Sequence, residues 1–217
     1  MSDFAEEPIY EQLARLGKAL ASPVRLRLLD VLDQGERTVE ELAEAAGIPL
    51  KNTSAQLQRL RAAHLVTARR SGTHVHYRVA DPRISRFLDE MQGLAYDRLA
   101  DLRASVAVHL GGGVEAVAAG DLAERLSDPG TLVVDVRSAE EYARGHVPGA
   151  VSVPFEQLRD RLGELPPDGE IVAYCGGPYC VVSPDAVRLL REHGFEARAL
   201  DGGFARWHRS GRPVRRG

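Results

Sequence analysis

Long apolar runs are missing from this chain of 217 residues. No stretch comes near the roughly 18 apolar residues that a membrane-spanning helix needs, and no charged-then-apolar leader stands at the N-terminus. Cysteine is scarce as well, since the chain has two, and both lie in one short stretch. This number and placement exclude the disulfide framework of a secreted scaffold. We therefore expect a soluble cytoplasmic protein that does not bind membranes. Its 44% of hydrophobic residues suffices for the packed cores of one or two domains.

Acidic residues are missing from one long segment, although the chain as a whole has 31 acidic and 28 basic residues. The 33 residues from Ile48 to Ala80 include no Asp or Glu. They include three histidines and six basic residues, which are Lys51, Arg59, Arg61, Arg69, Arg70 and Arg78. A surface that approaches phosphates explains this distribution, and an ordinary solvated basic face is the alternative.

Four helical patterns and a hairpin pattern fill the N-terminal part. Leucines recur at helical spacing over 9–21, a second helix begins at Pro23, and Thr38 with Glu41 forms the capping box of a third. Gly47 ends that helix, and a fourth runs from 50 to 64. An extended segment then turns at 71–72 and returns with alternating apolar residues, as a β-hairpin does. This order predicts a winged helix-turn-helix, an α+β fold that is mainly α.

The pattern resembles the ArsR/SmtB family of small dimeric repressors from Tyr10 to Leu110, through the stretch R-L-R-L-L-D-V-L and the leucines Leu57 and Leu60. The resemblance implies a homodimer on double-stranded operator DNA, with the fourth helix in the major groove and the hairpin as a wing. The residues expected to bind DNA are Lys51, Asn52, Ser54, Gln56, Arg59, Arg69 and Arg70.

Apolar residues recur at threes and fours from Asp81 to Leu110, which predicts one helix of about 25 residues. The resemblance makes it the dimerisation helix. Gly111, Gly112 and Gly113 follow as a flexible linker. We therefore expect a DNA-binding and dimerisation domain at 1–110, a linker at 111–113 and a second domain at 114–217.

Metal ligands are missing where the ArsR/SmtB family has them. The third helix has no cysteine, and His109 is the single histidine of the last helix. His74 and His76 alternate on the hairpin with no third ligand nearby, so we interpret them as wing residues. The sequence predicts no metal site and no cofactor.

Both cysteines lie in the stretch I-V-A-Y-C-G-G-P-Y-C-V-V-S, which runs from Ile171 to Ser183. The pattern is that of a strand, a tight loop and a helix start. Such a loop aims backbone N–H groups at one spot, so we expect a lowered pKa and nucleophilic character for Cys175. The alternative is that Cys175 and Cys180 are small apolar residues that fill a buried site.

The stretches around this loop, L-V-V-D-V-R-S-A-E-E-Y-A-R-G-H-V-P-G-A and L-D-G-G-F-A-R-W-H-R-S-G-R-P-V, resemble the rhodanese domain over 114–217. The resemblance implies an α/β fold with a parallel central sheet, braced by Asp135 and Arg137. It also implies that Cys175 carries a persulfide. The active-site loop would then be Gly176, Gly177, Pro178 and Tyr179.

This loop has no cation. Rhodaneses that use thiosulfate hold its oxyanion with Arg or Lys, so weak thiosulfate activity is expected here. Related phosphatases end a longer loop on Arg, whereas this chain has Val181 six positions after Cys175, which argues against a phosphatase.

The prediction is a DNA-binding repressor whose rhodanese domain handles persulfide, polysulfide or sulfide. Cys175 would accept sulfur, and Cys180 would be the resolving thiol of a reversible switch. One alternative is a working sulfurtransferase with an appended DNA-binding domain. Another is a repressor that responds to a metalloid through the same two cysteines.

Overall fold

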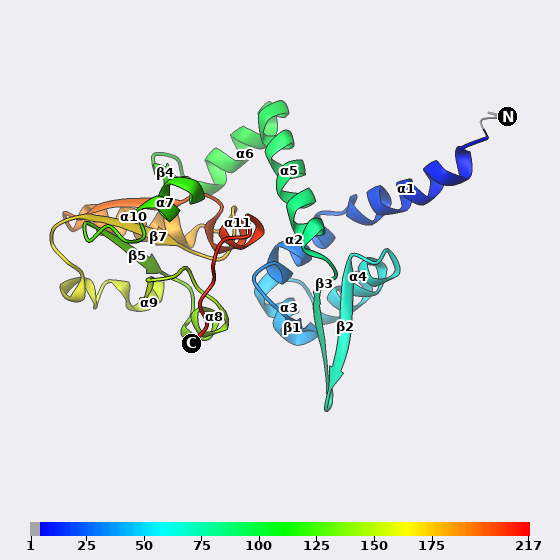
Figure 1. Cartoon of the computed structure of the whole chain (residues 1–217), viewed down its shortest axis with the longest axis horizontal. Coiled ribbons are helices and arrows are strands. Elements are labelled where there is room, and N and C mark those ends of the chain that lie inside the picture. The colour runs from blue at the N-terminus through cyan, green and yellow to red at the C-terminus, as the bar shows by residue number, and fades with distance from the viewer. Residues whose placement is uncertain (1–4) are drawn as a thin grey trace. The chain divides into compact units, whose positions relative to one another are not determined.

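The computed structural model describes residues 5–217, and Figure 1 shows the course of the chain. The chain forms two compact units that divide between Ser85 and Arg86. We refer to them as the N-terminal and C-terminal units. A three-stranded sheet belongs to the first and a five-stranded sheet to the second. Among the described residues, no helix combines the length and apolarity needed to cross a membrane.

The N-terminal unit is the expected winged helix-turn-helix. Pro23 opens the second helix, as predicted. Thr38 and Glu41 form both hydrogen bonds of the predicted capping box at the start of the third helix, and Gly47 ends that helix in the left-handed conformation with φ of 67°. The order is α1 (Glu7–Leu20), α2 (Pro23–Leu32), β1 (Arg37–Thr38), α3 (Val39–Ala46), α4 (Leu50–Ala62), β2 (Val66–Ser71) and β3 (His74–Val79).

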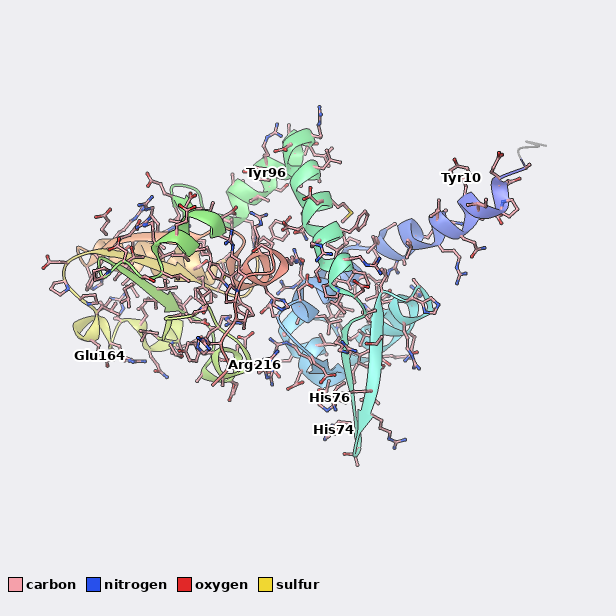
Figure 2. All side chains as sticks on the ribbon, viewed as in Figure 1. Tyr10, His74, His76, Tyr96, Glu164 and Arg216 are labelled. Atoms are coloured by element: carbon pink, nitrogen blue, oxygen red, sulfur yellow. The ribbon has the colours of Figure 1, made fainter. Side chains whose placement is uncertain are left out.

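The wing is the hairpin of β2 and β3, in which Ser71 pairs with His74 across a turn where Gly72 has φ of 60°. Strand β1 pairs with the other edge of β3. Leu28, Leu42 and Leu57 are fully buried in this unit. Figure 2 shows His74 nearer than His76 to the tip of the hairpin.

The prediction of a single helix after the wing is wrong, because this segment forms two helices, α5 (Pro82–Arg98) and α6 (Ala100–Leu110). Leu99 separates them with the extended values φ −106° and ψ 103°. Arg103 Nη1 donates to the carbonyl oxygens of Tyr96 and Asp97, at 2.7 and 2.9 Å, and so supplies partners for the last turn of α5. Apolar spacing continues across Leu99, so periodicity could not reveal the break.

The C-terminal unit contains the expected parallel sheet, in the order β4-β8-β7-β5-β6. Right-handed crossovers through helices are the usual way to join such strands. The elements are β4 (Ala116–Val117), α7 (Ala119–Arg125), β5 (Thr131–Asp135), α8 (Ala139–Arg144), β6 (Val151–Ser152), α9 (Phe155–Leu158), the 3₁₀ helix η1 (Leu162–Glu164), β7 (Glu170–Tyr174), α10 (Val182–Glu192), β8 (Glu196–Leu200) and α11 (Gly203–Arg209).

Successive strand residues face two different cores, as the pleat of a strand requires. Ile171 and Ala173 of β7 pack in the core that α9 and α10 complete, whereas Val172 and Tyr174 pack in the core that includes α7 and α11. Every residue of β7 is buried, so the strand that leads into the cysteine loop is fixed on both faces.

Candidate functional site

Helix α4 has one buried side and one exposed side. Thr53, Leu57 and Leu60 are fully buried at spacings of four and three, and the Thr53 hydroxyl donates to the Pro49 carbonyl oxygen at 3.2 Å. The predicted DNA-binding residues of this helix lie outside the buried side. Lys51, Asn52, Ser54 and Arg59 are exposed, and Gln56 is half-buried.

Gln56 is held by hydrogen bonds that the sequence did not reveal. Arg25 Nη1 donates to Gln56 Oε1 at 3.0 Å, and Gln56 Nε2 donates to Asn52 Oδ1 at 3.0 Å. Arg25 also donates to the Lys18 carbonyl oxygen at 2.9 Å, so it ties α4 to the end of α1. This network fixes the direction in which the Gln56 and Asn52 amides are presented.

The two wing arginines differ in their partners. Arg69 Nε and Nη2 donate to the Glu36 carboxylate at 2.9 and 2.5 Å, and the hydrogen bond from Arg69 is the main cause of the lowered pKa of Glu36. Arg70 Nε instead donates to the Gly72 carbonyl oxygen at 3.3 Å. Arg69 is therefore neutralised by a carboxylate that lies 33 positions earlier in the chain, a distance that no local pattern bridges.

The cysteine loop is anchored from α11. The N–H groups of Phe204 and Ala205 donate to the carbonyl oxygens of Cys175 and Gly176, each at 2.9 Å. Gly203 has φ of 59°, and a Cβ atom there would stand 2.6 Å from the Cys175 carbonyl oxygen. Only glycine combines this conformation with so close an approach, which explains one glycine of the L-D-G-G motif.

The Cys175 side chain is buried, with 1% of its surface exposed. Its Sγ lies 3.3 Å from Ser183 Oγ and 3.6 Å from the Cys180 carbonyl oxygen. Burial raises the pKa of this thiol well above its ordinary value, and the Cys180 thiol raises it further, while hydrogen bonds from Ser183 act in the opposite direction. The expected lowered pKa is wrong because removal from water outweighs the amide and hydroxyl donors.

Cys180 is half-buried, and both cysteines are thiols in the structure. The N–H of Cys180 donates to the Gly177 carbonyl oxygen at 3.2 Å, a turn that folds the loop back toward its start. The loop therefore brings together the two residues that the sequence singled out. It adds Ser183, which the sequence placed only at a helix start.

Helix α6 touches the same loop within the C-terminal unit. His109 Nε2 lies 2.8 Å from the Tyr179 carbonyl oxygen, and Arg188 of α10 donates to the Leu110 carbonyl oxygen. Neither contact has a signal in the local sequence, because its partners lie about 70 or more positions apart in the chain. Among residues 5–217, no group of three or more His, Cys, Asp and Glu side chains is placed to hold a metal ion.

Alkaline pH should weaken the C-terminal unit, because burial raises the pKa of Cys175 and of Tyr174. Stability from such a group is complete below its unfolded pKa, about 8.5 for Cys, and is lost as the pH rises toward the folded value. We expect the free energy of unfolding to fall by up to about 1.4 kcal/mol per pH unit between about pH 8.5 and 10. Urea unfolding followed by the fluorescence of Trp207 would measure this. An equal decline in Cys175→Ser would contradict the assignment to Cys175.

A winged helix-turn-helix and a parallel sheet with a cysteine loop define a DNA-binding protein that carries a rhodanese fold. A helix-turn-helix domain model matches residues 20–69 and a rhodanese-like domain model matches residues 118–210. The HTH-type transcriptional regulator Rv0324 of Mycobacterium tuberculosis is 46% identical over 209 residues, which make up 96% of this chain and 92% of that protein. The chain belongs to the ArsR-type helix-turn-helix transcriptional regulators with a C-terminal rhodanese-like domain.

Two further relatives each match one part. A sulfurtransferase of Allochromatium vinosum is 34% identical over 43% of this chain and 87% of that protein. The solution structure of the homodimeric winged helix-turn-helix DNA-binding domain Mb0332 of Mycobacterium bovis is 42% identical, with a TM-score of 0.42, and covers 46% of this chain and 94% of that one.

Proposed function

We propose that this regulator is a homodimeric repressor that reactive sulfur releases from its operator through Cys175 and Cys180. The observation that carries the proposal is the placement of two thiols in one loop, with Cys175 Sγ already 3.6 Å from the backbone of Cys180. A reactive cysteine with a partner thiol in the same loop can form a bridge that a reductant reverses.

The chemistry of the switch has two steps. One thiol takes the outer sulfur of a persulfide R–S–SH, so that the donor S–S bond breaks and R–SH leaves with the proton. The second thiol then attacks the first cysteine's own sulfur, which forms the Cys175–Cys180 disulfide and releases H₂S. The product is the same whichever cysteine reacts first. A longer polysulfide donor can leave additional sulfur atoms in the bridge.

The bridge would disturb contacts that lead out of the loop. The Tyr179 carbonyl lies between the two cysteines in sequence and contacts His109 of α6, while Ser183 contacts Cys175 and belongs to α10. Movement of the loop would therefore reach α6, part of the segment predicted to form the dimerisation helix. A tenfold loss of operator affinity needs only about 1.4 kcal/mol of coupling.

The test is operator binding measured with and without sodium tetrasulfide, on a DNA duplex selected for binding from a random library. We expect the treated protein to bind about tenfold more weakly, and dithiothreitol to restore the affinity. Cys175→Ser and Cys180→Ser should lose the response but keep the affinity of the untreated protein. Intact-mass spectra should show the bridge in the unmodified protein alone.

Other outcomes would support the alternatives. If tetrasulfide changes operator binding of Cys180→Ser as it does for the unmodified protein, the switch is wrong. Thiosulfate turnover comparable to that of a dedicated sulfurtransferase, with operator binding unchanged, would favour the enzyme. Release by arsenite but not by tetrasulfide would favour a metalloid-responsive repressor.

A further inference from the structure

A cavity of about 210 Å³ lies beside the cysteine loop, entirely within the C-terminal unit. Its lining includes Cys180, Ser183 and Gly177 of the loop and helix start, and Ala107 and Leu110 of α6. Tyr96 of α5, labelled in Figure 2, also lines it. The cavity is therefore lined both by the cysteine loop and by the helices α5 and α6.

The two cysteines differ in their access to this cavity. Cys180 lines it, whereas the lining does not include Cys175, which is 1% exposed. The two groups that Cys175 Sγ approaches most closely, Ser183 Oγ and the Cys180 carbonyl, belong to residues that do line the cavity. Cys180 and Ser183 thus contact Cys175 and also line the cavity.

The charge of the lining restricts what can bind. Asp201 is its one charged residue, and the remaining side chains are mostly apolar, among them Val106, Val114 and Pro178. Among the described residues, no Lys or Arg side chain lines the cavity. The two arginines next to it are engaged, Arg206 by the Asp201 carboxylate and Arg188 by the Leu110 carbonyl oxygen. An anion that leaves water for such a site would have to compete with these partners to compensate the loss of hydration. A small uncharged molecule does not incur this cost.

We propose that this cavity binds a small uncharged organic polysulfide, R–S–S–S–R, and that Cys180 is the thiol that this donor meets first. The proposal rests on the switch proposed above and adds its donor class and the order of its thiols. The Cys180 thiol attacks a terminal sulfur of the donor. A Cys180–S–S–R disulfide forms, the donor S–S bond breaks, and R–S–SH leaves with the proton.

The second step uses the buried thiol. Cys175 attacks the sulfur of Cys180, forming the Cys175–Cys180 disulfide, and R–SH leaves with the Cys175 proton. The raised pKa of Cys175 keeps it protonated and slow to react with donors in solution, so it reacts after Cys180 has brought a disulfide next to it. This order inverts the roles that the loop sequence suggests.

The order can be tested with dimethyl trisulfide as the uncharged probe. The rate of adduct formation by Cys180 in Cys175→Ser should match the initial rate of the unmodified protein. Adduct formation by Cys175 in Cys180→Ser should be slower by a factor of roughly ten or more. Equal rates for the two variants, or faster reaction of Cys175, would overturn the order. Tetrathionate, an anionic donor of sulfane sulfur, should react with Cys180 more slowly than the trisulfide, and the reverse preference would overturn the donor class.

The cavity can be tested without changing either cysteine. Ala107→Phe fills it from α6 and should slow the reaction of Cys180 with dimethyl trisulfide roughly tenfold. Ala104→Phe is the matched control, because Ala104 is an exposed alanine of the same helix that does not line the cavity, and it should leave the rate unchanged. An unchanged rate in Ala107→Phe would refute the role of the cavity.

The two proposals can fail separately. If the trisulfide reacts in the expected order while operator binding stays the same, the donor site stands and the sulfur switch fails. If operator binding responds to tetrasulfide but Ala107→Phe and Ala104→Phe react alike, the switch stands and the donor site fails.

Discussion

Replacement of Asp135 by Ala should lower the free energy of unfolding of the C-terminal unit by about 3–5 kcal/mol, since it leaves a buried guanidinium without its carboxylate. Arg137 Nη2 lies 2.6 Å from Asp135 Oδ2, and their side chains are 3% and 0% exposed. Burial acts to lower the pKa of Arg137, but the hydrogen bond and charge of Asp135 outweigh it, so the pKa is raised. The variant removes that compensation, but an arginine side chain keeps its proton in proteins, so Arg137 stays charged in Asp135→Ala.

The rest of the Arg137 environment cannot replace the carboxylate. Its Nη2 also donates to the Gly145 carbonyl oxygen at 2.7 Å, and its guanidinium carbon lies 4.2 Å from the centre of the Phe204 ring. A carbonyl and a ring face carry partial charge only, and cation–π contacts contribute about 0.5–2 kcal/mol. The loss should therefore exceed that of an ordinary ion pair.

Glu164→Ala provides the control. Glu164 pairs with Arg161 at 2.7 Å, but Glu164 is 59% exposed, and exposed ion pairs of this kind contribute little to stability. Figure 2 shows Glu164 on the surface of the unit. Urea unfolding followed by Trp207 fluorescence would measure both variants. Similar small losses in the two would show that Asp135 does not brace the fold.

The sequence predicted what depends on local spacing. The capping box of Thr38 and the turn at Gly72 follow from residue order, whereas the parallel sheet was implied by the rhodanese resemblance, and the structure confirms each. The break at Leu99 was missed because apolar spacing runs through it, and the hydrogen bonds from Arg103 that accompany it leave no periodic signal.

The candidate site shows the same limit. The loop sequence placed Cys175 and Cys180 together, but it could not supply the burial that raises the pKa of Cys175. Burial depends on β7, α10 and α11, which are separated in the chain. The partners Glu36 of Arg69 and Arg25 of Gln56 are likewise distant in sequence. Spacing thus identified the residue types, and tertiary contacts determine how each can act.

The different partners of Arg69 and Arg70, a carboxylate and a backbone carbonyl oxygen, predict unequal roles for the two wing arginines. Arg70→Ala should weaken binding to all DNA sequences, by roughly 30-fold at 0.15 M salt if each protomer of a dimer loses one phosphate contact. The estimate follows from a slope of about 0.9 in log affinity against log salt for each contact. The slope itself should therefore decrease by about two for the dimer. Arg70 is exposed, and its hydrogen bond to the Gly72 carbonyl oxygen is made by Nε and not by a terminal nitrogen.

Arg69→Ala is the matched comparison, at the neighbouring position of the same strand. Its guanidinium is already held by Glu36 through two nitrogens, so a phosphate would have to replace a carboxylate that is present without DNA. We expect a smaller loss of affinity and a change in slope below one per protomer. Glu36→Gln, which releases Arg69, should strengthen binding and steepen the salt dependence. Fluorescence anisotropy with one labelled duplex between about 0.05 and 0.3 M salt, over which the Debye length falls from about 14 to about 6 Å, would measure all three variants. Equal losses for Arg69→Ala and Arg70→Ala would show that the Glu36 ion pair does not restrain the wing.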